Sequence, residues 1–286
     1  MKQQKKTNSL ANNSSSRTKK LANVFSEGVI RELEISVNSQ CNLNCIGCGF
    51  NVPNQLSPYS KLGIDEHIDA LLNLKRCGVK INKIIIAGGE ATLFKDLYTT
   101  VRKIKDIDVS KEVELVTNGL YPKGLPPELL CILDSIVISD YIKTNTFESA
   151  WTDFLQGHNF KGNIDFRRKD AWDDLLSEVY NSREETEHHW QTCFYRKFDV
   201  SLERRRIFSC SRIAKKGWDD QGLLINEKTN LEQVINYLSD KKPKEACYSC
   251  ATVNRESSIK VAVQSSGNLE RIAGKSIQYL KENNNK

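Results

Sequence analysis

Between Arg31 and about residue 180, short apolar runs alternate with amphipathic stretches, and this alternation constrains the fold more than any other feature. We expect strands at 33–37, 84–87, 113–116, 136–138 and 164–166, and helices at 64–77, 95–107, after Pro126 and at 175–179. Strands that alternate with helices predict a parallel α/β sheet or barrel. About five or six such units are too few to close an eight-stranded barrel, so the expected fold is an open, partial (β/α)5–6 TIM-like barrel.

Polar residues and cysteines follow the ends of these strands. Cys41, Cys45 and Cys48 follow the first strand, and Gly88-Gly89-Glu90 the second. Thr117-Asn118-Gly119 and Ser139-Asp140 follow the third and fourth, and Arg167 lies near the end of the fifth. Because ligands gather at the carboxyl ends of parallel strands, these residues predict one shared site.

The alternation stops near residue 183. Two short strands at 198–202 and 206–209 predict a hairpin, and a helix is expected at 230–238. Four cysteines flank them: Cys193, Cys210, Cys247 and Cys250. Four thiolates can hold either zinc or a complete iron–sulfur cluster. We therefore expect a basic disordered tail at 1–24, the partial barrel at 25–182, a small hairpin-and-helix cluster domain at 183–253, and a C-terminal extension at 254–286 with a weak helical stripe.

Composition narrows the class of protein. No apolar run is long enough for a membrane span, and no secretory signal precedes the first strand, so a cytoplasmic location is expected. The net charge of +6 equals the six Lys and Arg residues of positions 1–20. A solvated tail is expected there rather than a nucleic-acid-binding arm. Cys77 and Cys131 lie in apolar helical patterns and are expected to be buried thiols.

The first three cysteines are one ligand short of a closed zinc site. Soft thiolates select zinc or iron–sulfur clusters, and the following loop offers no further cysteine or histidine before His67. A [4Fe–4S] cluster held by Cys41, Cys45 and Cys48 would keep one iron open for an external ligand.

This pattern resembles the C-x3-C-x2-C motif of radical S-adenosylmethionine (SAM) enzymes. The resemblance implies that SAM binds the open iron and is cleaved reductively to a 5′-deoxyadenosyl radical, with electrons from a flavodoxin- or ferredoxin-type donor. Gly88-Gly89-Glu90 is similar to the family's GGE motif, which contacts the SAM amino group. Thr117 and Asn118 resemble its third-strand signature, and Ser139 and Arg167 occupy positions that often complete SAM binding. One residue departs from the pattern: the position before the third cysteine is usually aromatic and is Gly47 here, so adenine is expected on the backbone or on Phe50.

The second set of cysteines resembles the auxiliary-cluster domains called SPASM and twitch. Four cysteines imply the twitch form with one fully ligated [4Fe–4S] cluster. The arrangement is more similar to that of 2-deoxy-scyllo-inosamine dehydrogenases than to the GTP cyclases of molybdenum-cofactor synthesis, which have three auxiliary cysteines and a C-terminal Gly-Gly.

The expected reaction is hydrogen abstraction from a small polyhydroxylated molecule, a sugar or cyclitol, with oxidation of a secondary alcohol to a ketone and the auxiliary cluster as electron acceptor. Epimerisation, dehydration and peptide or protein modification stay open as alternatives. A non-enzymatic iron–sulfur or zinc protein would not explain Gly88-Gly89-Glu90. The basic run Arg167-Arg168-Lys169 is expected to be solvated, and His188, His189 and Trp190 are candidates to line the cavity, with no residue assigned as catalytic.

Overall fold

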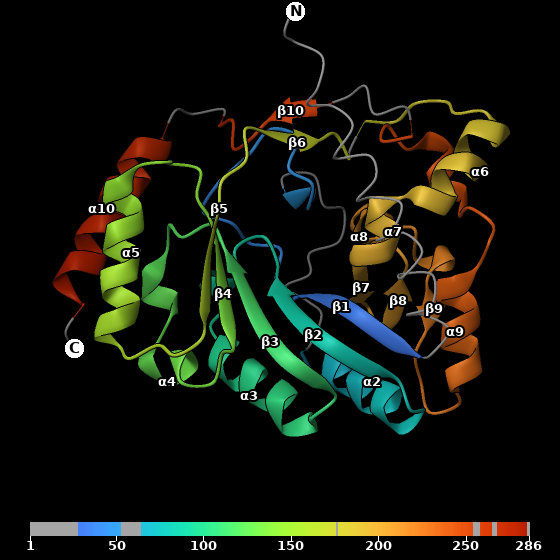
Figure 1. Cartoon of the computed structure of the whole chain (residues 1–286), viewed down its shortest axis with the longest axis horizontal. Helices are drawn as coiled ribbons and strands as arrows, with labels where there is room; N and C mark the ends of the chain where they lie inside the picture. Colours follow the sequence, from blue (N-terminus) through green and yellow to red (C-terminus); the bar gives the residue numbers. More distant parts are fainter. Residues whose placement is uncertain (1–27, 53–63, 176, 254–257, 265–267, 285–286) are drawn as a thin grey trace, which may run out of the picture.

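The fold is built on one mostly parallel sheet, seen in a computed structural model that describes residues 28–52, 64–175, 177–253, 258–264 and 268–284 (Figure 1). Its strands are β1 (Val29–Ser36), β2 (Lys80–Ala87), β3 (Ser110–Thr117), β4 (Ser135–Ser139), β5 (Asn163–Arg167), β7 (Val200–Glu203), β8 (Arg206–Phe208) and β9 (Leu223–Leu224). Their order across the sheet is β5-β4-β3-β2-β1-β7-β8-β9. The expected α/β class and the predicted strands are confirmed.

Strands β1 to β5 and β7 run parallel, whereas β8 and β9 run antiparallel to their neighbours. The central strands β2 and β4 carry continuous apolar runs, Ile84-Ile85-Ile86 and Ile136-Val137-Ile138, which are buried or half-buried, as is typical of the inner strands of a parallel sheet. Within the described residues β5 and β9 are edges that do not pair with each other, so the sheet is an open, partial barrel.

Helices cover the sheet and fill its connections. The longer ones are α2 (Ile64–Arg76), α3 (Leu97–Ile107), α5 (Asn145–Gly157), α6 (Arg183–Thr192), α9 (Leu231–Ser239) and α10 (Leu269–Glu282). The short ones are α4 (Pro127–Leu130), α7 (Phe194–Phe198) and α8 (Ser211–Lys215). Helices α2, α3 and α4 lie along one side of the sheet, and α10 packs beside α5 (Figure 1). No helix of the described ranges combines the length and apolar character that a membrane crossing needs.

The predicted hairpin is continuous with the main sheet. Strand β7 pairs in parallel with β1, matching Leu33 with Val200 and Ile35 with Leu202. The side chains of Leu33, Ile35 and Leu202 are fully buried, so one apolar core runs through this junction. The domain boundary expected at 183 therefore separates segments of the chain that share one sheet.

Two expectations are wrong. The segment 175–179 is not helical at its described residues: Glu178 forms an antiparallel bridge with Cys250, and Val179 N–H donates to Ser249 O at 3.2 Å. This segment is extended instead, and its main chain pairs with the distant residues Ser249 and Cys250. Cys131 follows α4 and is exposed, because that helix ends after one turn and leaves the thiol outside the core. The 1–24 tail lies outside the described residues.

A small second sheet crosses the mouth of the barrel. Strand β6 (Ala171–Asp173) pairs antiparallel with β10 (Ser258–Lys260), matching Trp172 with Ile259. In Figure 1 this pair lies above the carboxyl ends of the parallel strands. It joins the chain after β5 to the C-terminal extension.

Candidate functional site

The loop that carries the first three cysteines leaves β1 and stays attached to β2. Beyond the strand ends, Gly89 N–H donates to Asn38 O at 3.0 Å and Glu90 N–H donates to Gln40 O at 2.6 Å. These bonds extend the β1–β2 pairing up to Cys41. The cysteine loop therefore starts from a fixed position at the carboxyl edge of the sheet.

The two glycines after β2 are required by this close pairing. A Cβ at Gly89 would lie 2.3 Å from Gln40 O, and one at Gly88 would lie 2.8 Å from Asn38 O. Both distances are shorter than any normal Cβ contact, so a side chain would push the two segments apart. These close approaches give one reason for glycine at both positions, and the contact of Gly88 and Gly89 with SAM stays a prediction.

The Glu90 carboxylate ties β2 to β3. It accepts hydrogen bonds from Thr92 N–H at 3.0 Å, Thr92 Oγ1 at 2.6 Å, Thr117 Oγ1 at 2.6 Å and Asn118 N–H at 2.7 Å. Burial raises the pKa of Glu90, and these donors act in the opposite direction. Glu90 is 1% exposed, so its side chain is enclosed by the residues that donate to it. Glu90 thus positions the segments after β2 and β3, and its contact with the SAM amino group stays a prediction.

Asn118 carries the connection from β3 to the cysteines. Its Nδ2 donates to Asn42 Oδ1 at 2.7 Å and lies 3.8 Å from Cys41 Sγ. Its Oδ1 accepts from Leu120 N–H at 2.9 Å, which orients the amide. The predicted residues Thr117 and Asn118 thus lie against Glu90 and Cys41, at one end of the sheet.

Nitrogen donors point at the sulfur atoms of this loop. Besides Asn118, Leu43 N–H donates to Cys41 Sγ at 3.4 Å, and Gln264 Nε2 donates to Cys45 Sγ at 3.0 Å. Such N–H···S contacts are typical of thiolates that ligate iron–sulfur clusters, where they tune the reduction potential. The donor set and its surroundings fit a cluster held by Cys41, Cys45 and Cys48.

Burial gives the thiols of Cys41 and Cys45 a high pKa. It raises the pKa of Cys41 to about 12 and that of Cys45 to about 11. A bound metal deprotonates its cysteine ligands outright, which compensates this cost of burial.

Ser139 and Arg167 lie side by side, because they are register partners at the ends of β4 and β5. Arg167 Nη2 is 3.6 Å from Asp165 Oδ2, and its side chain is 44% exposed. The structure brings Ser139 and Arg167 to the same sheet edge as the cysteine loop, and their contact with SAM stays a prediction.

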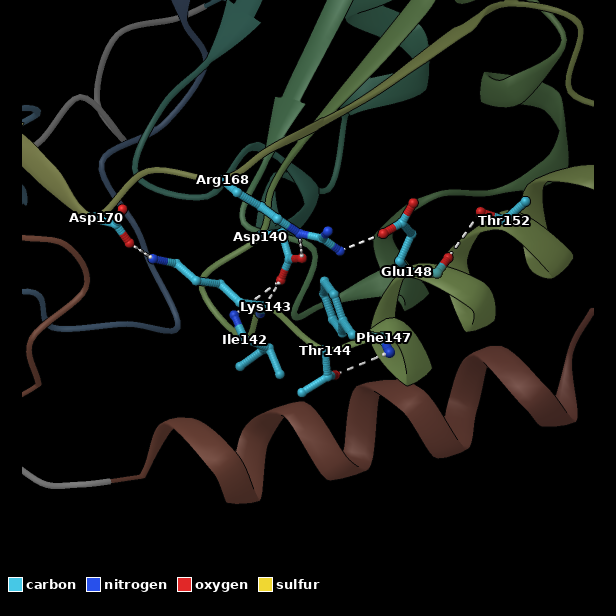
Figure 2. Close-up of polar contacts among 9 residues, drawn as sticks. All are labelled: Asp140, Ile142, Lys143, Thr144, Phe147, Glu148, Thr152, Arg168 and Asp170. Atoms are coloured by element: carbon cyan, nitrogen blue, oxygen red, sulfur yellow. Dashed lines mark hydrogen bonds and ion pairs between the residues drawn. The ribbon is translucent and has the colours of Figure 1, made fainter. Parts of the chain in front are cut away.

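The neighbouring Arg168 is paired instead of solvated (Figure 2). Its Nε donates to Asp140 Oδ2 at 2.7 Å, and its Nη2 donates to Glu148. Asp140, which is fully buried, also accepts from Ile142 N–H at 3.0 Å and Lys143 N–H at 2.8 Å. These contacts cross-link the ends of β4 and β5 and the start of α5, so Arg168 supports the rim of the barrel.

The four remaining predicted cysteines line one cavity. Cys193 lies between α6 and α7, Cys210 directly precedes α8, and Cys247 and Cys250 lie in or beside the short helix Glu245–Ser249. His189 and Trp190 line the same cavity. Three separate segments therefore deliver four thiols to one place.

Two arginines also line this cavity. Arg212, which is 3% exposed, donates to Leu175 O at 2.8 Å, Ala246 O at 2.9 Å and Ser249 O at 3.2 Å. Arg196 donates to Asp240 O at 2.6 Å and lies 4.3 Å from the Trp190 ring centroid. Burial raises the pKa of Cys193, Cys210 and Cys247, the last to about 12. Cationic side chains beside buried thiols suit a cluster whose four thiolate ligands make it negatively charged.

Among the described residues, no three His, Cys, Asp or Glu side chains meet the geometry for a single metal ion. The assignment of the seven cysteines as cluster ligands stays a prediction. Sequence reasoning missed Gln264, Arg196 and Arg212. The two arginines could have been found from the sequence, because Arg196 and Arg212 follow Cys193 and Cys210 closely along the chain. No local pattern marks Gln264.

Comparisons with known proteins agree on one part of the chain. Residues 35–143 match the family model described as "Radical SAM superfamily". A GTP 3′,8-cyclase from Limosilactobacillus fermentum is 36% identical over 93 residues, which are 31% of this chain and 26% of that protein. A GTP 3′,8-cyclase from Nautilia profundicola is 35% identical over 103 residues, which are 36% of this chain and 32% of that protein. The chain thus spans about a third or less of the length of these curated relatives.

One solved structure is similar over a larger part of the chain. It is described as "Crystal structure of BtrN in complex with AdoMet and 2-DOIA" and covers 76% of this chain and 84% of its own, at 16% identity and a TM-score of 0.45.

Proposed function

We propose that the whole chain is a radical SAM oxidoreductase with an auxiliary [4Fe–4S] cluster, and the match of residues 35–143 to the radical SAM family model supports this. The proposed substrate is a small polyhydroxylated molecule, a sugar or cyclitol, whose secondary alcohol is oxidised to a ketone. One observation carries the proposal beyond the family: Cys193, Cys210, Cys247 and Cys250 line a single cavity together with Arg196 and Arg212.

The first site would supply a 5′-deoxyadenosyl radical from SAM and one external electron. Cys41, Cys45 and Cys48 would hold its cluster, and Glu90, Thr117 and Asn118 position that loop. The proposed contacts for SAM lie at the same edge and are Gly88, Gly89, Glu90, Thr117, Asn118, Ser139 and Arg167. Their location at strand ends supports this role.

The proposed reaction balances in two steps. The radical takes one hydrogen atom from the carbinol carbon, and 5′-deoxyadenosine and methionine are released. The remaining substrate radical then loses one electron to the auxiliary cluster and one proton to a base or solvent, which forms the ketone. A cluster with four cysteine ligands has no open iron for substrate, so electron transfer is the use that its ligation favours.

We propose a flavodoxin- or ferredoxin-type donor and a cytoplasmic location as parts of the same function. A second candidate, cyclisation of a purine nucleotide, is favoured by the GTP 3′,8-cyclases among the relatives. At the coverage of those alignments, the similarity supports radical SAM chemistry and leaves the substrate open.

The test uses anaerobically reconstituted full-length protein. About eight iron atoms per chain are expected, and reduced protein mixed with SAM is expected to release 5′-deoxyadenosine. Polyols deuterated at the carbinol carbon, labelled GTP and labelled peptides are then compared for deuterium transfer into 5′-deoxyadenosine. Transfer from a polyol with one ketone formed supports the dehydrogenase. Transfer from GTP supports the cyclase, and the absence of 5′-deoxyadenosine in every mixture contradicts both.

A further inference from the structure

We propose that Gln264, in the C-terminal extension, is a positioning residue of the first cysteine site, and that its hydrogen bond to Cys45 raises the reduction potential of the cluster held there. This inference rests on the proposed function. It adds a residue 219 positions away from the cysteine it contacts.

The hydrogen bonds of Gln264 settle the orientation of its amide. Gln264 Oε1 accepts from Asn44 N–H at 2.8 Å, and only the oxygen can take that role. The amide nitrogen must then face Ala262 O, at 3.0 Å, and Cys45 Sγ, also at 3.0 Å. Both of these are acceptors, so the donor and acceptor assignments agree.

The main chain holds the same contact. Cys45 and Gln264 form an antiparallel bridge, and Ile46 N–H donates to Val263 O at 2.8 Å. The side chain of Gln264 therefore reaches Cys45 from a backbone that is already paired with the cysteine loop. Cys45 is buried, so this bond is made away from bulk water.

The extension also occupies the space beside Gly47. Gly47 has φ +69°, and a Cβ there would lie 2.1 Å from Ile259 Cδ1. Ile259 lies in β10, opposite Trp172 of β6, and the Trp172 ring packs edge-on against Tyr141 with centroids 5.7 Å apart. The segment Ser258–Gln264 is thus anchored to the barrel through β6 and packs where the side chain before the third cysteine would otherwise project.

The chemical consequence follows from charge. A hydrogen bond to a ligating thiolate stabilises the more negative, reduced cluster more than the oxidised one. Removing the hydrogen-bond donor at Gln264 should therefore lower the midpoint potential of the cluster. A given electron donor would then convert a smaller fraction of the cluster to its reduced state.

The experiment compares full-length, reconstituted wild type with Gln264→Leu, Gln264→Glu and the control Gln278→Leu. Gln278 is exposed on α10, and its Nε2 donates to Glu282 Oε1 of the same helix at 2.9 Å. The first cluster is identified by the change that added SAM causes in its low-temperature EPR signal, and its midpoint potential is measured by redox titration. Iron content and the circular dichroism spectrum are measured for each variant.

A lower midpoint potential in both Gln264 variants, with wild-type iron content and an unchanged Gln278→Leu, is the expected result. Gln264→Glu should fall at least as far as Gln264→Leu, because an ionised carboxylate donates no bond and adds a negative charge beside the sulfur. Unchanged potentials in fully loaded variants overturn the inference and leave the proposed function standing. A wild-type protein whose spectrum does not respond to SAM overturns the proposed function and, with it, this inference.

Should the Gln264 variants lose the cluster, the wild type provides a second measurement. Exchange into deuterium oxide should replace an exchangeable side-chain amide proton close to the cluster. Electron–nuclear double resonance on the SAM-responsive signal should then show the loss of that proton's coupling. Labelling the glutamine side chains with 15N assigns that coupling to a glutamine amide. No 15N coupling at this cluster would contradict the proposed bond.

Discussion

The Thr117 hydroxyl donates to the Glu90 carboxylate at 2.6 Å and joins the carboxyl ends of β3 and β2 behind the cysteine loop. The same hydroxyl oxygen accepts from Gly119 N–H at 3.0 Å, so it orders the turn after β3 as well. Thr117 and Glu90 are both almost completely buried. This pair shows why a signature read as ligand-binding has a structural role as well.

Thr117→Val should destabilise the protein by about 1–3 kcal/mol, because a buried carboxylate loses a charge-assisted hydrogen bond while its shape is kept. Chemical denaturation under anaerobic conditions measures the change. Thr99→Val, at an exposed position of α3, is the control and should change the free energy of unfolding by less than about 0.5 kcal/mol. Equal effects of the two substitutions would contradict the role assigned to Thr117.

Gly89→Ala should prevent correct seating of the cysteine loop, because its Cβ would lie 2.3 Å from Gln40 O. Since that neighbour is backbone, neither side can move cheaply, and we expect a large loss of iron at the first site and a lower unfolding midpoint. Gly274→Ala is the control: a Cβ at Gly274, within α10, meets nothing within 4 Å. It should stabilise the protein by about 0.5–1 kcal/mol, since alanine favours a helix. Normal iron content in Gly89→Ala would refute this reading of the glycine.

Cys250→Ala should separate the two proposed steps. Its thiol lines the cavity that also holds Cys193, Cys210 and Cys247, and it lies 3.1 Å from Thr252 Oγ1. We expect a loss of about half the iron, continued release of 5′-deoxyadenosine and at least a tenfold loss of ketone product. Cys131→Ala, at an exposed cysteine, should match the wild type in all three measurements. Full iron content in Cys250→Ala would rule out Cys250 as a ligand.

His67 should make the protein less stable in mild acid. Burial, followed by the positive charge of Lys215, lowers the pKa of His67 from 6.5 to about 4. The unfolded chain therefore binds a proton in this window that the folded chain refuses, so stability falls as pH drops from about 6.5 to about 4. The shift corresponds to a loss of about 3 kcal/mol at the lower end. His67→Leu should flatten the pH dependence of the unfolding free energy over this window. The control His188→Leu, at an exposed position, should not. Identical pH profiles for the wild type and both variants would contradict the role assigned to His67.

Lys215 is the buried cation between β1 and the hairpin. Its Nζ donates to Glu203 Oε1 at 2.5 Å and lies 3.2 Å from Glu34 Oε1, with its side chain only 1% exposed. Lys215→Met leaves the buried Glu203 and the partly buried Glu34 without their cation and should cost about 3–5 kcal/mol. Lys103→Met breaks the exposed pair with Asp65 and should cost about 1 kcal/mol or less. A small effect of Lys215→Met on the unfolding free energy would show that the carboxylates are neutral or find other partners.

The sequence predicts the parts of this protein that depend on local pattern. Apolar runs such as Ile84-Ile85-Ile86 predict buried parallel strands, and the structure confirms them because strand burial follows directly from side-chain periodicity. The same reasoning failed at 175–179. A short apolar pattern suits a helix turn or an extended segment equally well, and pairing of Glu178 with Cys250 decided between them.

For the candidate site, the sequence predicts where the residues lie but not what each of them contacts. Cysteine spacing and the position of each motif after a strand predict which residues gather at the mouth, because parallel strands place their carboxyl ends at one edge. What each residue does there depends on its neighbours. Glu90 is enclosed by Thr92 and Thr117, and Arg168 is held by Asp140 and Glu148.

Local periodicity and cysteine spacing by themselves determined the strand-and-helix core and the two sets of thiols, because both are properties of residues close together in the chain. Tertiary structure alone decided that β7 extends the barrel sheet and that Gln264 returns to Cys45. Contacts between residues so far apart depend on how the intervening elements pack, and no local preference in the chain encodes that packing.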